Sequence, residues 1–230
     1  NGNGWTFSNI AIAENATDPG FFGEPGPIEP GNLAGEETFA YPDGPLAGRS
    51  GGLHWDYDNS TENDPFFGHT GTRSDWDVVF VAPTVAGGTL ITQESGAIRE
   101  YNGPGEGAQG GSDERFGAVS DDAVFDKHVV YYKFDMTRRA GAVWSGASSY
   151  DFTSEKYLFG VPTAPNPASG NREFAIHDLN SDQWAYSGIQ PVNGQTYTLV
   201  AKLDFDANVA ALYLNPNLAL PESQNTPVAT

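Results

Sequence analysis

Two segments in the second half of the chain alternate between apolar and polar side chains with the two-residue period of a β-strand. In residues 128–138 (HVVYYKFDMTR) Tyr131, Lys133 and Asp135 share one face, and the other face carries Val130, Tyr132, Phe134 and Met136. Residues 195–216 alternate in the same way around Asp206 and Asn208, two residue types that favour turns. These patterns predict a half-buried strand and a β-hairpin.

Glycine and proline divide the rest of the chain into short pieces. The 28 glycines and 16 prolines in 230 residues interrupt the sequence too often for long helices. Only residues 120–128 could begin a helix, with Ser120 as its N-cap. Further strand candidates are residues 76–82, 88–94, 155–161 and 172–179. The chain is therefore predicted to be all-β, a two-sheet antiparallel β-sandwich with at most a short helical turn.

Three stretches resemble the laminin-G-like or concanavalin-like jelly-roll domains of secreted bacterial surface proteins. They are ETFAYPDGPLAGRSGG (residues 37–52), YYKFDMTR (131–138) and GQTYTLVAKLDFDANVAALYLNPN (194–217). The resemblance covers roughly residues 37–217 and implies a jelly roll and an extracellular or cell-surface location, with the signal peptide removed. It does not select a function, because such folds carry lectins, adhesion modules, enzymes and passive spacers.

The first strand candidate, WTFSNIAIAE (residues 5–14), stands apart from this domain. A proline- and glycine-rich stretch, residues 15–36, follows it and is predicted to be a linker to a jelly-roll domain of residues 37–230. Trp5 and Phe7 share one parity, whereas Ile10 and Ile12 have the other. The pleat therefore changes phase at Ser8 or Asn9, which predicts a bulge or a strand buried on both faces.

This strand resembles the terminal strand that jelly rolls of this kind pair beside their first strand. It could complete the sheet of its own domain, or it could insert into a neighbouring copy by donor-strand complementation. Head-to-tail insertion does not close by symmetry and would produce a filament or a surface array. The strand could equally end the preceding module of a longer tandem chain.

The charge of the chain restricts its partners. Thirty acidic residues against eleven basic ones give a net charge of −19, which disfavours nucleic acid, anionic lipid and polyanionic glycans. Neutral glycans, cations and other protein modules remain. No apolar run approaches the length of a membrane span, so membrane insertion is not expected.

The candidate catalytic groups do not form a known constellation. Glycoside hydrolases need two carboxylates facing one cleft. The same-face pairs Asp75/Asp77 and Asp204/Asp206 are interpreted as polar strand ends. The residues that a lyase could use fit no lyase motif: Arg99, His128, Tyr131 and Lys133. The sequence therefore predicts a non-catalytic protein.

Two binding sites are proposed from the sequence. Residues 56–65 concentrate hard oxygen donors, namely Asp56, Asp58, Glu62 and Asp64, which could bind Ca²⁺ or form a solvated acidic loop. In SDQWAYSG (181–188), turn residues flank Trp184, which with Tyr186 and Asp182 could bind a neutral glycan or belong to the core. The function expected is an extracellular structural or adhesive module that self-associates through Trp5, Phe7, Ile10 and Ile12. The alternative is a monomeric, lectin-like glycan-binding module.

Overall fold

The computed structural model describes residues 4–14, 22, 33–49, 77–78, 83–93, 97–98, 129–151, 154–205 and 207–230. Within these ranges lie fourteen strands and one short 3₁₀ turn, η2 (Glu222–Gln224). The strands are β1 (Trp5–Glu14), β2 (Leu33–Glu37), β3 (Gly44–Pro45), β4 (Asp77–Val78), β5 (Thr84–Ala86), β6 (Thr89–Thr92), β7 (Ala97–Ile98), β8 (Val129–Arg138), β9 (Ser145–Asp151), β10 (Ser154–Val161), β11 (Ala175–Asp178), β12 (Gln183–Tyr186), β13 (Thr196–Asp204) and β14 (Val209–Leu214).

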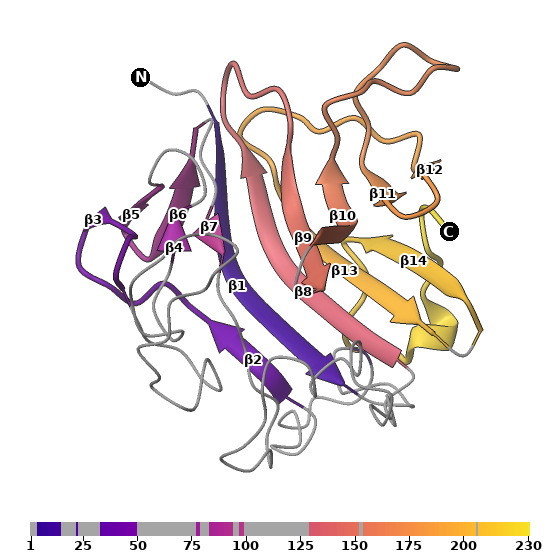
Figure 1. Cartoon of the computed structure of the whole chain (residues 1–230), viewed down its shortest axis with the longest axis horizontal. Coiled ribbons are helices and arrows are strands. Elements are labelled where there is room, and N and C mark those ends of the chain that lie inside the picture. Colours follow the sequence, from indigo (N-terminus) through magenta and orange to yellow (C-terminus); the bar gives the residue numbers. More distant parts are fainter. Residues whose placement is uncertain are drawn as a thin grey trace.

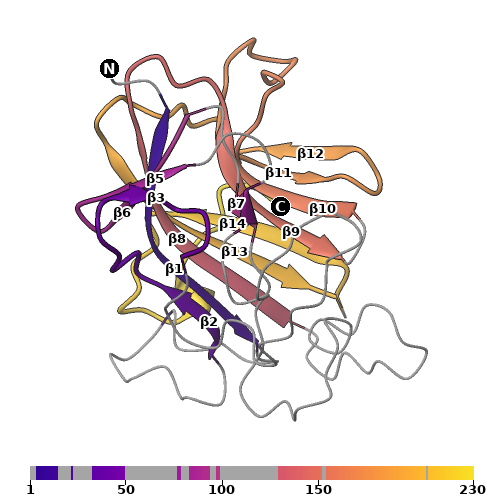
Figure 2. The same cartoon turned by 60° about the vertical axis from the view of Figure 1, so that its left-hand side comes forward.

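The strands build two antiparallel sheets that pack face to face (Figure 1, Figure 2). The large, eight-stranded sheet has the order β14-β13-β8-β1-β6-β5-β3, and β2 also pairs with β1. The small sheet has the order β12-β11-β10-β9, and β4 pairs with β7 as a separate ribbon. This confirms the predicted all-β, two-sheet sandwich.

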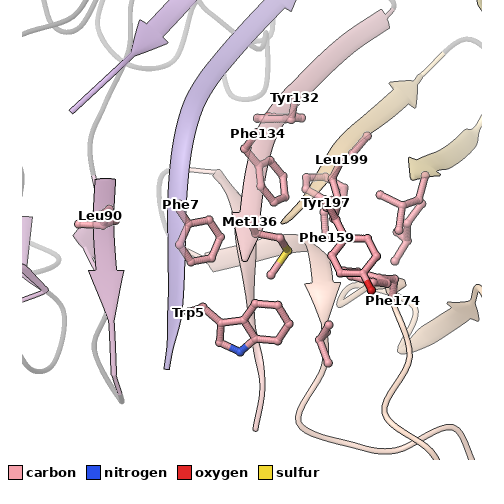
Figure 3. Packing of buried hydrophobic residues seen from close by; sticks show 14 of the residues in the cluster. Trp5, Phe7, Leu90, Tyr132, Phe134, Met136, Phe159, Phe174, Tyr197 and Leu199 are labelled. Carbon is pink, nitrogen blue, oxygen red and sulfur yellow. The ribbon is translucent and has the colours of Figure 1, made fainter. Parts of the chain in front are cut away.

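The main core lies between the two sheets and is rich in aromatic rings. Tyr132 of β8 meets Phe159 of β10 with ring centroids 5.2 Å apart, so large side chains from both layers interlock. Figure 3 shows the packing of Trp5, Phe7, Leu90, Tyr132, Phe134, Met136, Phe159, Phe174, Tyr197 and Leu199. The predicted alternation is confirmed, because Val130, Tyr132, Phe134 and Met136 all face this core. The predicted hairpin is β13 and β14, with Asn208 in its turn at φ 52°.

Strand β1 lies inside the large sheet and contains a bulge. Ser8 pairs with Asp135 of β8, but the next paired residue, Ala11, lies opposite Lys133, so β1 carries one extra residue. Asn9 takes a left-handed conformation at φ 52°, and its Nδ2 donates to Asp135 Oδ2 at 2.8 Å. The predicted phase change is confirmed. It lets Ile12 face the same core as Trp5 and Phe7.

A second apolar cluster covers the opposite face of the large sheet at one end. It consists of Ala11, Ala13, Phe22, Val129, Tyr131, Val200, Ala211 and Tyr213, with Leu218 packed against it. Strand β8 is therefore buried on both faces there, and its interpretation as half-buried was wrong for Tyr131, which is 1% exposed. Residues after β14 fold back beside it, where the Val228 N–H donates to the Leu212 carbonyl at 2.7 Å.

A buried carboxylate organises the chain at the end of β2. Glu37, at the end of β2, accepts hydrogen bonds from the Phe39 N–H at 2.6 Å and from the Tyr41 hydroxyl at 2.5 Å. Burial of a carboxylate is tolerable when its oxygens have donors. The ETFAY stretch therefore fixes a bend in the chain. Strand β2 also occupies the last four residues of the range predicted to be a linker.

Candidate functional site

Three ring side chains stand on the outer face of the small sheet. Neighbouring residues of a strand point to opposite faces, and Ile176 of β11 and Ala185 of β12 pack on the main core. His177 of β11 and the two aromatic residues of β12, Trp184 and Tyr186, therefore point away from that core. His177 and Trp184 are a directly opposed pair in the β11–β12 register.

The three rings lie nearly parallel. The His177 and Trp184 ring centroids are 3.5 Å apart with planes inclined by 13°, and Trp184 and Tyr186 are 5.8 Å apart at 12°. His177 thus covers one face of the indole. The other face is turned away from β11, and β12 is the edge strand of this sheet within the described part of the chain. We call Trp184 and Tyr186, backed by His177, the aromatic wall.

A tight turn of residues 179–182 ends the wall on one side. Asp178 Oδ1 accepts from the Asn180 N–H at 2.9 Å, and its Oδ2 accepts from the Ser181 hydroxyl at 2.7 Å. Asp182 takes a left-handed conformation at φ 53°. Its Oδ1 lies 3.0 Å from His177 Nε2, which donates to it, while the Asp182 side chain is 87% exposed. A carboxylate acceptor is therefore held beside the ring row and remains open to solvent.

The loop between β10 and β11 (residues 162–174) lies at the other end of the wall. The Tyr186 hydroxyl donates to the Pro165 carbonyl at 3.5 Å. Glu173, which is 3% exposed, accepts from Asn166 Nδ2 at 2.8 Å and from the Ser169 hydroxyl at 2.6 Å. It also accepts from the Gly188 N–H at 3.2 Å. One carboxylate therefore holds this loop against the segment that follows β12.

The charges of this region follow from these contacts. Hydrogen bonds from Ser169 and Asn166 hold the pKa of Glu173 below its usual value despite its burial, so Glu173 is anionic at neutral pH. Burial raises the pKa of the Tyr186 phenol, and the charge of Glu173 raises it further. Tyr186 therefore stays a neutral hydrogen-bond donor. Burial acts to raise the pKa of Asp178, but hydrogen bonds from Ser181 and Asn180 outweigh it and lower that pKa.

The structure brings together the three residues that the sequence grouped as a glycan site, Trp184, Tyr186 and Asp182. The sequence did not place His177 in this group. The stack depends on the pairing register of β11 with β12, which residue spacing alone does not reveal. The one sequence signal for the position of His177 was the strand pattern of residues 172–179 ahead of a turn.

The other two predicted sets lie elsewhere. Trp5, Phe7 and Ile12 are buried in the main core, with Ile10 packed against it, and their strand pairs with β8, β6 and β2 of its own chain. The predicted calcium ligands Asp56, Asp58, Glu62 and Asp64 lie outside the described residues. That site stays a prediction, which a change of melting temperature on adding EGTA would test. Within the described ranges, no three metal-ligating side chains are grouped to hold an ion.

No protein-family model matches this chain, and no curated protein or solved structure matches it. The function is therefore inferred from the fold and from the geometry of the aromatic wall. What they define is a two-sheet β-sandwich with a row of rings on the outer face of its small sheet. None of the residues described forms a helix long and apolar enough to cross a membrane.

Proposed function

We propose that this protein is a non-catalytic, carbohydrate-binding module that holds a neutral glycan on the aromatic wall. The observation that supports this most is the parallel alignment of the partly exposed rings of Trp184 and Tyr186 on β12, the edge strand of the small sheet in the described part of the chain. The axial C–H groups of a pyranose ring are weakly positive and pack against the electron-rich face of an aromatic ring. Trp184 and Tyr186 are two residues apart on β12, so their parallel rings can offer such faces to consecutive sugar units.

The polar groups beside the wall suit sugar hydroxyls. Asp182 presents an exposed carboxylate acceptor at one end, and Tyr186 supplies a neutral phenol at the other. Ligand sites commonly combine a flat apolar surface with a few placed polar groups. Glu173 and Asp178 instead direct their oxygens at donors of their own loops, which supports binding without catalysis.

The net charge of −19 further favours a glycan without carboxylates or sulfates. The resemblance to laminin-G-like and concanavalin-like jelly rolls is compatible with this sandwich and supports an extracellular setting. In that setting the module would attach its protein to a polysaccharide, which is an adhesive role.

The test is binding to a panel of neutral oligosaccharides, namely cellohexaose, laminarihexaose and mannohexaose, by isothermal titration calorimetry. We expect at least one series to bind, and we expect Trp184→Ala to weaken that binding by about tenfold or more, because about 1.4 kcal/mol of stacking is lost. Trp144→Ala is the matched control, since Trp144 is 47% exposed and lies between β8 and β9, outside the small-sheet hairpin. Equal effects of both variants, or no binding by any probe, would reject the proposal.

Assembly through β1 is the alternative to this monomeric module. A strand exchanged between copies would make the same pairs with β8 and β6 that β1 makes here, as domain swapping does. Such an exchange would array the aromatic walls of many copies along a filament. Light scattering of the full chain distinguishes the two, because strand exchange gives filaments and pairing within one chain gives a monomer.

A further inference from the structure

We propose that the aromatic wall binds the terminal units of a glycan chain and excludes internal stretches, because the β10–β11 loop closes one end of the wall. The inference rests on the proposed glycan binding and adds to it which part of the glycan is recognised. It also gives Glu173 a role as a positioning residue. It follows from the different structures at the two ends of β12.

The wall has an open end and a closed end. Along β12 the order is Asp182, then Trp184, then Tyr186, and the hairpin turn before β12 projects away from the rest of the sandwich (Figure 2). Asp182 on that turn is 87% exposed. At the opposite end the Tyr186 hydroxyl meets the Pro165 carbonyl, and the β10–β11 loop extends beyond the end of the small sheet (Figure 1). A sugar chain lying along the rings can continue past Asp182, but the loop meets it beyond Tyr186.

The closing loop is held by its own hydrogen bonds and by Glu173. The Gly170 N–H donates to the Asn166 carbonyl at 2.7 Å, and the Asn166 N–H donates to the Asn171 carbonyl at 2.8 Å. Glu173 also accepts hydrogen bonds from the side chains of Asn166 and Ser169 and from the Gly188 N–H. Hydrogen bonds to a buried carboxylate are among the stronger ones in proteins. The loop is therefore a fixed stop and does not depend on ligand to form.

The spacing of the rings sets the length of the site. With ring centroids 5.8 Å apart, Tyr186 and Trp184 can each face one of two consecutive sugar units. The terminal unit would lie on Tyr186 against the loop, the next unit would lie on Trp184, and the chain would leave beside Asp182. One chain end then binds one protein molecule, whatever the length of the chain.

Calorimetry with one glycan series of increasing length tests this. For the glycan series that binds, we expect the trimer, tetramer and hexamer to bind the whole protein with the same affinity within about twofold. Each oligosaccharide should bind one protein molecule. Chemical modification of one of the two terminal units of the hexamer should abolish binding. Several proteins bound per long chain, or binding that survives modification of either end, would overturn the proposal.

Variants separate this inference from the proposed function. Glu173→Gln places an amide NH₂ among N–H and O–H donors, so it should release the loop and allow several proteins to bind along one long chain. Ser169→Ala removes one donor from the same clamp and serves if Glu173→Gln does not fold. Glu222→Gln is the matched control and should leave chain-end binding intact. If Trp184→Ala abolishes binding while the wild type already binds internal units, the inference fails and the proposed function stands; if no probe binds, both fail.

Discussion

Single glutamates tie together segments that are distant in this acidic sequence. Glu222 of η2 accepts from the Tyr213 hydroxyl at 2.6 Å and the Tyr131 hydroxyl at 2.7 Å, and its Oε1 lies 3.2 Å from Lys202 Nζ. Burial alone would raise the pKa of Glu222, but these hydrogen bonds and the lysine charge lower it below its usual value. A carboxylate with a lowered pKa in the fold stabilises the protein when it is ionised.

The stability of the protein should therefore fall in acid, and Glu222 should contribute to this. Its contribution is complete above about pH 4.5, the pKa of an unperturbed glutamate, and is lost as the pH falls through its lower pKa in the folded protein. We expect Glu222→Gln to lower the free energy of unfolding by about 1–3 kcal/mol at neutral pH. The variant and the wild type should converge as the pH falls below the lowered pKa of Glu222. Urea denaturation at neutral and acidic pH measures this, and a difference that persists unchanged in acid would contradict the assignment.

At the scale of the element, the bulge in β1 sets which side chains reach which apolar cluster. Asn9 supplies the extra residue in a left-handed conformation, which costs a residue with a β-branched side chain about 1–2 kcal/mol. Beyond the bulge Ile12 faces the main core, while Ala11 and Ala13 face the tighter second cluster. The bulge thus matches the size of each side chain to the space on its side.

Replacing Asn9 by a β-branched residue should therefore destabilise the protein, whereas glycine should be tolerated. We expect Asn9→Val to lower the free energy of unfolding by about 1–2 kcal/mol, and Asn9→Gly to stay within about 1 kcal/mol of the wild type. Deleting Asn9 removes the extra residue while Ala11 keeps its place opposite Lys133 and Ile12 its place opposite Tyr132. The deletion variant should therefore keep its apolar faces and a cooperative unfolding transition. Urea denaturation followed by circular dichroism measures all three variants, and an Asn9→Val variant as stable as the wild type, or a deletion variant without a cooperative transition, would contradict this account of the bulge.

For the molecule as a whole, β1 is an interior strand of its own sheet. It pairs with β8 along most of its length and with β6 and β2 on its other side. Removing it leaves unpaired backbone groups in the middle of the large sheet and removes Trp5 and Phe7 from the core.

We therefore expect a discrete monomer by size-exclusion chromatography with light scattering, and a chain that does not fold after deletion of residues 1–14. Added peptide of residues 5–14 should restore folding, since it can supply the same strand. Filaments of the full chain that give folded monomers on this deletion would instead support strand exchange between copies.

The resemblance and the alternating patterns predicted much of this architecture. Residues 128–138 and 195–216 gave β8 and the β13–β14 hairpin correctly, because an apolar side chain at every second residue indicates a strand with one face on a core. The sequence also grouped Trp184, Tyr186 and Asp182, since they lie within five residues of one turn. It could not add His177 or Glu173, because their roles depend on strand register and on a loop brought from elsewhere.

By itself, the sequence determined the class of fold, the hairpin, the phase change in β1 and the local makeup of the aromatic wall. Each of these is encoded by neighbours along the chain, through the two-residue period of a strand or the chemistry of a turn. Only the tertiary structure showed that β1 lies between β8 and β6 in the large sheet, that the residues after β14 pack near Tyr131, and that the β10–β11 loop meets Tyr186. These depend on pairings between residues far apart in sequence, which local patterns do not specify.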